Sequence, residues 1–296
     1  MTRFRVDPGN AGRRVDHLVA VALPGLSVAT ARRWIAEGAV RVDGRPARKG
    51  EHLIEGQTLE VDESAASRSG PEALRVRPDG QLAIAILLVD PAFVAVDKPA
   101  GIPSHPRAAG ELGTAANAIV ARFPECAAAS PDPREGGLVH RLDTGTSGVL
   151  LAARDAAVWP ELRAALCRAD CEKTYLAEVS GAPPDAGEAS APIGRVGRRG
   201  ARVRVGGGRN PLSAHTTWEV IARRPETTLL RVRLRKGRAH QVRAHLAAAG
   251  YSIVGDSIYG GCAADRLHLH AATVQFRHPR SSALILVESP PPTWAK

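Results

Sequence analysis

A polar segment near residue 70 divides this chain into two parts with different sequence patterns. Residues 62 to 80, DESAASRSGPEALRVRPDG, are rich in Ser, Gly, Pro and Ala, which is typical of an interdomain linker. A chain of 296 residues with 44% hydrophobic residues is long enough for two domains and can bury a core in the larger one. We therefore predict a small domain over residues 1–62, a linker over 63–80 and a larger domain over 81–296.

The first part of the chain has the pattern of two helices followed by a hairpin. Apolar residues recur three and four positions apart over residues 15 to 23, which predicts a helix that buries one face. A second helix is predicted from an N-cap at Ser27 to a stop at Gly38. Short strands are predicted around residues 40 to 42 and 59 to 61, with a turn at Asp43-Gly44 after the first.

This part resembles the S4 RNA-binding domain across RRVDHLVAVALPGLSVATARRWIAEGAVRVDGRPARKGEHLIEGQTLEV, residues 13 to 61. The chain as a whole has a formal net charge of +10 and a pI near 10.2, which suits a partner rich in phosphates but does not separate RNA from DNA or an anionic membrane. The alternative for the small domain is a charged helical face without a ligand. We predict that the neighbouring arginines 32 and 33 lie in solvent. The basic residues predicted to contact RNA are Arg32, Arg33, Arg41, Arg45 and Lys49.

The larger part has the pattern of a β-rich domain. The apolar runs IAILLVD and FVAVDKP are separated by Asp90-Pro91-Ala92, which predicts a hairpin. Helices are predicted near residues 114 to 122, 156 to 170 and 239 to 249. Because strands and helices do not alternate regularly, the fold class is α+β. Later strands are predicted at GLVH, GVLLAA, TYLAEV, HTTWEVI and LLRVRLR.

The segment LVHRLDTGTSGVLLAAR, residues 138 to 154, is predicted to be two strands joined by a polar loop. An Asp held between two strands, here Asp143, has the rigid support that a nucleophile needs. The alternative is an Asp side chain that caps its own turn, which is common in loops. The loop by itself leaves both interpretations open.

The string HRLDTGTSG in this loop matches the H-R-L-D-x-x-T-S-G signature of the RluA-type pseudouridine synthases. Similarity continues through VDKPAGIPSHP, EKTYLAEVSG, GRAHQVRAHLAAAGYSIVGDSIYGG and LHLHA, and it covers nearly all of residues 84 to 280. The resemblance implies a mixed, largely antiparallel β-sheet flanked by helices. It also implies an isomerase that detaches uracil from ribose C1′, turns the base and rejoins it through C5.

The same resemblance implies roles for individual residues. Asp143 is the nucleophile, Arg238 forms its salt bridge and Tyr175 stacks on the flipped base. Arg238 would otherwise be a surface phosphate contact, and Tyr175 a residue of the strand core. The residues implied to bind substrate are His140, Arg141, Thr146, Gln241, Arg243 and Leu269, the last of which packs under the base.

The sequence also limits cofactors and partners. It lacks the phosphate-loop, dinucleotide-binding and H-E-x-x-H motifs, and Cys167 and Cys171 have no second close pair that would complete a zinc site. We therefore predict no metal and no small-molecule cofactor. With no apolar leader or membrane-length stretch, we predict a cytoplasmic monomer whose partner is RNA, with ribosomal RNA favoured over transfer RNA. The alternatives are a non-catalytic RNA-binding or ribosome-assembly factor and, with little support, a hydrolase.

Overall fold

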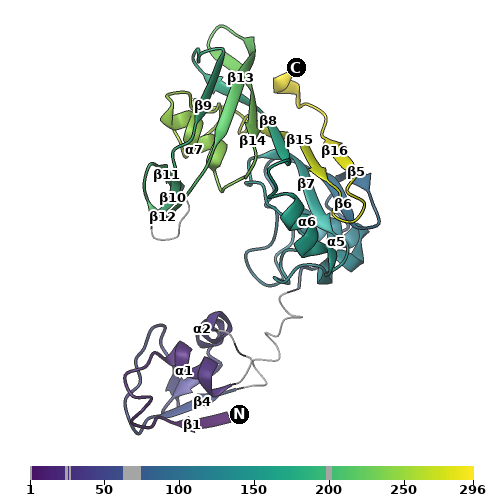
Figure 1. Ribbon diagram of the computed structural model, residues 1–296. Coiled ribbons are helices and arrows are strands. Elements are labelled where there is room, and N and C mark those ends of the chain that lie inside the picture. The colour runs from purple at the N-terminus through teal and green to yellow at the C-terminus, as the bar shows by residue number, and fades with distance from the viewer. Residues whose placement is uncertain (1, 24–25, 27, 63–74, 198–201) are drawn as a thin grey trace. The chain divides into compact units, whose positions relative to one another are not determined.

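The computed structural model describes residues 2–23, 26, 28–62, 75–197 and 202–296 (Figure 1). The chain forms two compact units, residues 1–74 and 75–296. This division lies within the predicted linker, of which residues 63–74 are outside the described ranges, as is the predicted N-cap Ser27. In the described ranges, no helix combines the length and the apolar character needed to cross a bilayer.

The first unit is a small antiparallel sheet packed against two helices. Its strand order is β1 (Thr2–Arg5), β4 (Thr58–Val61), β2 (Val40–Val42) and β3 (Arg45–Pro46). The apolar faces of α1 (Val15–Ala22) and α2 (Val28–Ala36) enclose one core with the strands. The helices and hairpin agree with the sequence prediction, whereas β1 was not predicted.

The predicted basic surface of this unit is partly used in internal ion pairs. Asp16 is 1% exposed and accepts hydrogen bonds from both Arg14 and Arg32. The Arg32 side chain is 47% exposed, as predicted, but it is also paired with Asp16, because burying that carboxylate requires a cationic partner. Arg45 is similarly paired with Glu51.

The other three predicted basic residues of the unit have different settings. Arg33 Nε lies 3.8 Å from Glu37 Oε1, and the Arg33 side chain is only 27% exposed. Arg33 was predicted to lie in solvent, but its side chain is largely covered. Arg41 and Lys49 are exposed, and Arg41 donates to the backbone carbonyl of Gly44.

The second unit is built on a nine-stranded mixed sheet (Figure 1). Among the described strands of this sheet, one pairing is parallel, that of β15 with β7 through His270 and Ser147, and the others are antiparallel. The main path runs in the order β5 (Ala85–Val89), β6 (Phe93–Lys98), β7 (Ser147–Ala153), β15 (Leu269–Arg277), β8 (Glu172–Ser180), β14 (Thr227–Leu234), β13 (Thr216–Arg223) and β9 (Ala186–Ala189), with β16 (Leu284–Glu288) paired to β15.

Strand β15 connects two halves of this sheet. On one side it pairs with β7, and on the other with β8. Helices α5 (Ala115–Arg122) and α6 (Val158–Ala165) lie beside the β6 and β7 half, and α7 (Gln241–Ala248) lies beside the β13 and β14 half (Figure 1). A second, three-stranded sheet of β11 (Arg202–Val205), β10 (Ile193–Val196) and β12 (Arg209–Leu212) lies against α7. Short 3-10 turns occur at η1 (Pro124–Ala128) and η2 (Thr293–Ala295).

The α+β prediction is confirmed, with one local error. The predicted helices correspond to α5, α6 and α7, and four of the five later strands are present as β7, β8, β13 and β14. GLVH is not a strand, because Leu138 makes only an isolated bridge to Ala152 and the following His140 ring is bonded to the Leu151 amide. Strands β9 to β12, β15 and β16 were not predicted.

Candidate active site

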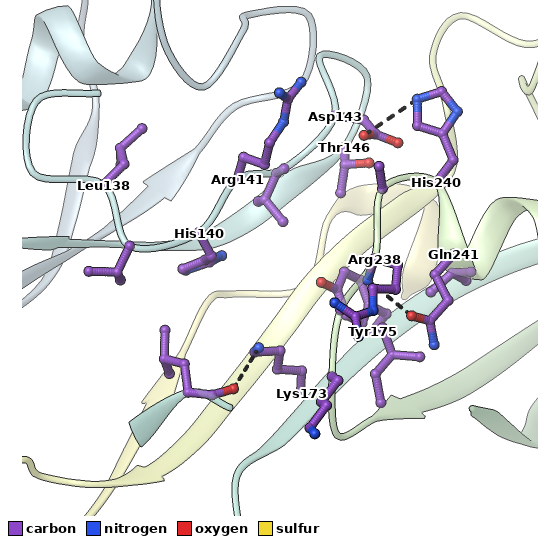
Figure 2. Close-up of a pocket in the computed structure, with 18 of the residues that line it drawn as sticks. Leu138, His140, Arg141, Asp143, Thr146, Lys173, Tyr175, Arg238, His240 and Gln241 are labelled. Atoms are coloured by element: carbon purple, nitrogen blue, oxygen red, sulfur yellow. Dashed lines mark hydrogen bonds and ion pairs between the residues drawn. The ribbon is translucent and has the colours of Figure 1, made fainter. Parts of the chain in front are cut away.

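A cavity of about 440 Å³ opens between the two halves of the large sheet. Its walls come mainly from the loop before β7, strand β8, residues 234–243 from the end of β14 to the start of α7, and the start of β15 (Figure 2). His105, the C-terminal end of α6 with the two residues after it, and Arg195 of β10 complete the lining. The structure places all the site residues predicted for the larger domain in this lining: His140, Arg141, Asp143, Thr146, Tyr175, Arg238, Gln241, Arg243 and Leu269.

Buried polar side chains hold the loop that carries Asp143 through hydrogen bonds to its backbone. The Ser104 hydroxyl donates to the carbonyl of Leu142 at 2.8 Å and accepts its N–H at 3.0 Å. The fully buried Lys98 donates to three backbone carbonyls, including that of Thr144 at 3.4 Å. Asp143 therefore has a rigid backbone on both sides, while its side chain remains 18% exposed to the cavity.

The cation that pairs with Asp143 is Arg243. Its Nη1 donates to Asp143 Oδ2 at 2.9 Å, and its Nε and Nη2 donate to the two carboxylate oxygens of Asp256 at 2.8 Å each. The prediction that Arg238 makes this salt bridge is wrong. The Arg238 side chain lines the same cavity, but its Nε is buried without a hydrogen-bond partner, and its backbone N–H donates to Gln241 (Figure 2).

Arg243 stays charged although it is only 8% exposed. Burial disfavours the cation, but hydrogen bonds to Asp256 and Asp143 outweigh that cost and raise its pKa. For Asp256, burial opposes ionisation, yet the hydrogen bonds from Arg243 and the backbone N–H groups of Ile258 and Tyr259 lower its pKa. The charges of Arg243 and Asp256 thus compensate each other in the interior, and one N–H group of Arg243 is left to donate to Asp143.

His240 lies on the other side of the Asp143 carboxylate. It adopts a left-handed backbone conformation, with φ of 55°, at the N-terminus of α7. Its Nε2 lies 3.7 Å from Asp143 Oδ1 (Figure 2), and its Nδ1 lies 3.1 Å from the Tyr259 hydroxyl. Burial is the largest influence on the imidazole and lowers its pKa. A neutral ring therefore stands beside the carboxylate at pH 7.

Tyr175 and Leu269 form the less polar part of the cavity. They come from the paired strands β8 and β15, where Tyr175 is opposite Ala271 and Leu269 is opposite Ala177. Leu269 is 3% exposed. Burial, together with the nearby charge of Asp143, raises the pKa of Tyr175, so its hydroxyl is a neutral phenol. A flat base can pack against such a surface.

Gln241 and His140 line the cavity but are also bonded to the protein. The Gln241 Nε2 donates to the His215 carbonyl and the Thr216 hydroxyl. His140 Nε2 accepts the backbone N–H of Leu151 at 3.1 Å. These polar atoms maintain the walls and are not free for substrate. Of the remaining predicted residues, Thr146 is buried and Arg141 is exposed at the cavity.

Sequence reasoning missed the contribution of Asp256 and the position of His240 beside the carboxylate. Asp256 belongs to GDSIYGG and accepts the N–H groups of the residues two and three positions further on, which is the local signature of an Asp turn. That signature was readable from the sequence. Its pairing with Arg243, thirteen residues earlier, depends on the tertiary fold.

Comparison with known proteins assigns the family. The model of the RNA pseudouridylate synthase family matches residues 92–248. The chain belongs to this family. The S4 domain model matches residues 13–58, so the S4 prediction is also confirmed. This chain is therefore an RNA pseudouridine synthase with an S4 domain, and its reaction class is isomerisation of uridine in RNA.

Relatives match the synthase along nearly its whole length. A ribosomal large subunit pseudouridine synthase D of Xanthomonas campestris pv. campestris is 35% identical, and the alignment covers 95% of this chain and 86% of the relative. An uncharacterized RNA pseudouridine synthase of Mycobacterium bovis is 35% identical over 97% of this chain and 93% of its own. The solved human RNA Pseudouridylate Synthase Domain Containing 1 has a TM-score of 0.58 at 24% identity and covers 73% of this chain and 86% of its own, which supports the fold.

Proposed function

We propose that this synthase isomerises uridines of large-subunit ribosomal RNA with Asp143 as its nucleophile. The observation that carries the assignment is the ion pair of Asp143 with Arg243, at 2.9 Å, inside a cavity that also contains Tyr175 and Leu269. Proteins named ribosomal large subunit pseudouridine synthase D among the relatives support the choice of RNA.

The proposed role of Asp143 is to form a bond from its carboxylate oxygen to ribose C1′ as the N1–C1′ bond breaks. The uracil turns within the cavity, and the bond from Asp143 to C1′ breaks when C5 bonds to C1′. The hydrogen on C5 leaves as a proton while N1 gains one, so the product is an isomer of the substrate. Arg243 holds the carboxylate in position and supports its negative charge, which is the form that can react.

The proposed role of the apolar wall is to retain the base while it is detached. Tyr175 stacks on the flipped uracil, which contributes about 1 to 3 kcal/mol for one base, and Leu269 packs on the uracil from strand β15. Because the phenol of Tyr175 is neutral, it adds no charge to repel the base anion. Extruding a base from structured RNA costs a few kcal/mol, so such packing offsets part of that cost.

The proposed role of the S4 unit is to hold structured RNA through its phosphates. Arg41 and Lys49 are exposed and fit this role. Arg32 and Arg45 are engaged with Asp16 and Glu51, so they contribute less to phosphate binding. Such contacts orient an RNA without reading its sequence.

The activity and the role of Asp143 are tested together by tritium release from RNA labelled at uridine C5. Wild type is expected to release tritium from ribosomal RNA, whereas Asp143→Asn is expected to release none and still to bind that RNA in a filter assay. Asp185→Asn is a matched control, because the Asp185 side chain is 92% exposed and pairs on the surface with Arg223. Full release by Asp143→Asn would refute the nucleophile assignment, and release from transfer RNA alone would refute the choice of RNA.

A further inference from the structure

The lining of the cavity includes residues that the proposed chemistry leaves unused, and we call the part of the cavity beside them the side lobe. We define the side lobe by Glu135, His140, Arg163, Leu166, Cys167 and Lys173, which line the cavity together with the site residues. Lys173 and Tyr175 alternate on one strand, so their side chains project from the same face of β8 about 7 Å apart along it. The side lobe is therefore about one strand repeat away from the predicted base-stacking residue.

Lys173 is a buried cation with too few partners. It is 7% exposed, and its Nζ donates to the carbonyl of Leu166 at 3.1 Å (Figure 2). An ammonium has three N–H donors, and this is the one acceptor described for it. The other deeply buried lysine, Lys98, donates to three backbone carbonyls. Buried donors that the fold does not satisfy call for a ligand or water.

His140 adds a second donor at the same place. Its Nε2 accepts the N–H of Leu151, so the ring proton is on Nδ1, for which no partner is described. Burial and the neighbouring charge of Lys173 lower the pKa of His140 to about 3, so the ring is neutral at pH 7. Lys173 extends toward the side where His140 lies (Figure 2), and both present N–H groups to the side lobe.

The surroundings favour a neutral acceptor over a phosphate. Glu135 is part of the lining, and burial raises its pKa because its charged form is poorly solvated there. A phosphate would add a second negative charge beside this carboxyl group. The apolar side chains of Leu138, Val139 and Leu166 also line this part of the cavity, and they suit the face of a flat ring.

We infer that the side lobe binds the base next to the target uridine and selects a keto base, uracil or guanine, through Lys173 and His140. A keto oxygen accepts hydrogen bonds from both N–H groups. The amino group of cytosine or adenine at the equivalent ring position is itself a donor, so it could not accept from Lys173 or His140. The inference rests on the proposed function, since it assumes that the target base occupies the cavity at Asp143.

The test compares short RNAs that contain one mapped target uridine and differ only in the flanking base. Wild type is expected to release tritium on the order of tenfold faster when one flank is U or G than when it is C or A, which is the discrimination that a base-specific hydrogen-bonding contact provides. Lys173→Met is expected to reduce this ratio toward one. Lys296→Met, which removes the same charge from an exposed residue, is expected to leave the ratio unchanged.

The ratio separates specificity from folding, because misfolded protein slows every substrate equally. A wild-type rate that is independent of both flanks, or an unchanged ratio in Lys173→Met, would overturn the inference while leaving the synthase activity established. No release from any RNA by wild type would instead refute the proposed function.

Alkylation of cysteines gives an independent measurement of occupancy. Cys167 is exposed and lines the side lobe, while Cys262 is exposed and is absent from the described cavity lining. Bound substrate RNA with a keto flank is expected to slow the reaction of Cys167 with N-ethylmaleimide at least severalfold and to leave that of Cys262 unchanged, as quantified by mass spectrometry. Equal rates at Cys167 with and without RNA would contradict binding in the side lobe.

Discussion

Asp256 is expected to control Arg243, and through it the nucleophile, without touching the substrate. In Asp256→Asn, the remaining carbonyl oxygen can stay on the N–H groups of Ile258 and Tyr259, which Oδ1 accepts at 3.0 and 3.1 Å. The new amide group then takes the place of Oδ2 and faces the Nε donor of Arg243, whereas Nη2 can stay on the carbonyl oxygen. The substitution therefore removes one hydrogen bond of 2.8 Å from a buried guanidinium, and it removes the negative charge that strengthened the other.

The size of the effect follows from this burial. Removing one partner of a buried ion pair costs about 3 to 5 kcal/mol, which would lower the urea midpoint by about 1 to 2 M. The freed guanidinium no longer fixes Asp143, and a displacement of about 1 Å in a reacting group can cost about 100-fold in rate. We expect Asp256→Asn to reduce tritium release by that order under conditions where the protein is folded.

The control is again Asp185→Asn, which makes the same chemical change in a surface ion pair with Arg223. Exposed pairs contribute about 0 to 1 kcal/mol, so this variant should retain its rate and nearly all its stability. Arg243→Lys combined with Asp256→Asn completes a double-mutant cycle, in which the two losses should not add. If Asp256→Asn has the stability and rate of Asp185→Asn, the proposed control of Asp143 through Arg243 is refuted.

Two further predictions concern the loop before β7 and the S4 unit. Gly148→Ala should unfold or inactivate the second unit, because φ is +112° and a Cβ atom would overlap the Ala271 carbonyl; Gly145→Ala, whose Cβ would lie 3.1 Å from the Leu267 Cβ, should be milder in thermal denaturation. Burial raises the pKa of Asp16, but Arg32 and Arg14 more than reverse this and lower it to about 2. The ionised Asp16 stabilises the folded state by at most about 2 kcal/mol, and this stabilisation is present above pH 4 and lost as the pH falls through 2. The urea midpoints of wild type and Asp16→Asn should therefore converge near pH 2. A difference in midpoint that persists at pH 2 would exclude this linkage.

The sequence was sufficient for the features that depend on local pattern. Helical periodicity located α1, and the apolar runs on either side of Asp90-Pro91-Ala92 located the β5–β6 hairpin. Strand β15 was not predicted. Its residues LHAATVQFR mix His, Gln and Arg with apolar side chains, so they lack the regular alternation that predicts a strand. The strand is stabilised instead by its pairing with strands from distant parts of the chain.

The site was predictable as a set of residues but not as a set of contacts. Motif resemblance placed Asp143, Tyr175 and Leu269, and the fold brings them to one cavity. The resemblance assigned the salt bridge to Arg238, whereas the structure forms it with Arg243, five positions further on. Their difference comes from α7, where Arg243 is turned inward against Asp256 while Arg238 precedes the helix.

The position of β15 between β7 and β8 has a consequence for biosynthesis. Asp143 is attached to one side of this strand through β7, and Arg243 follows β14 on the other. A ribosome makes the chain from its N-terminus, so the nucleophile and its cation are both synthesised before the strand that links their two halves. A nascent chain that ends before Leu269 has every charged group of the ion pairs around Asp143 but no closed cavity. The pairing of β15 with both halves therefore cannot form until well after Asp143 and Arg243 have been synthesised.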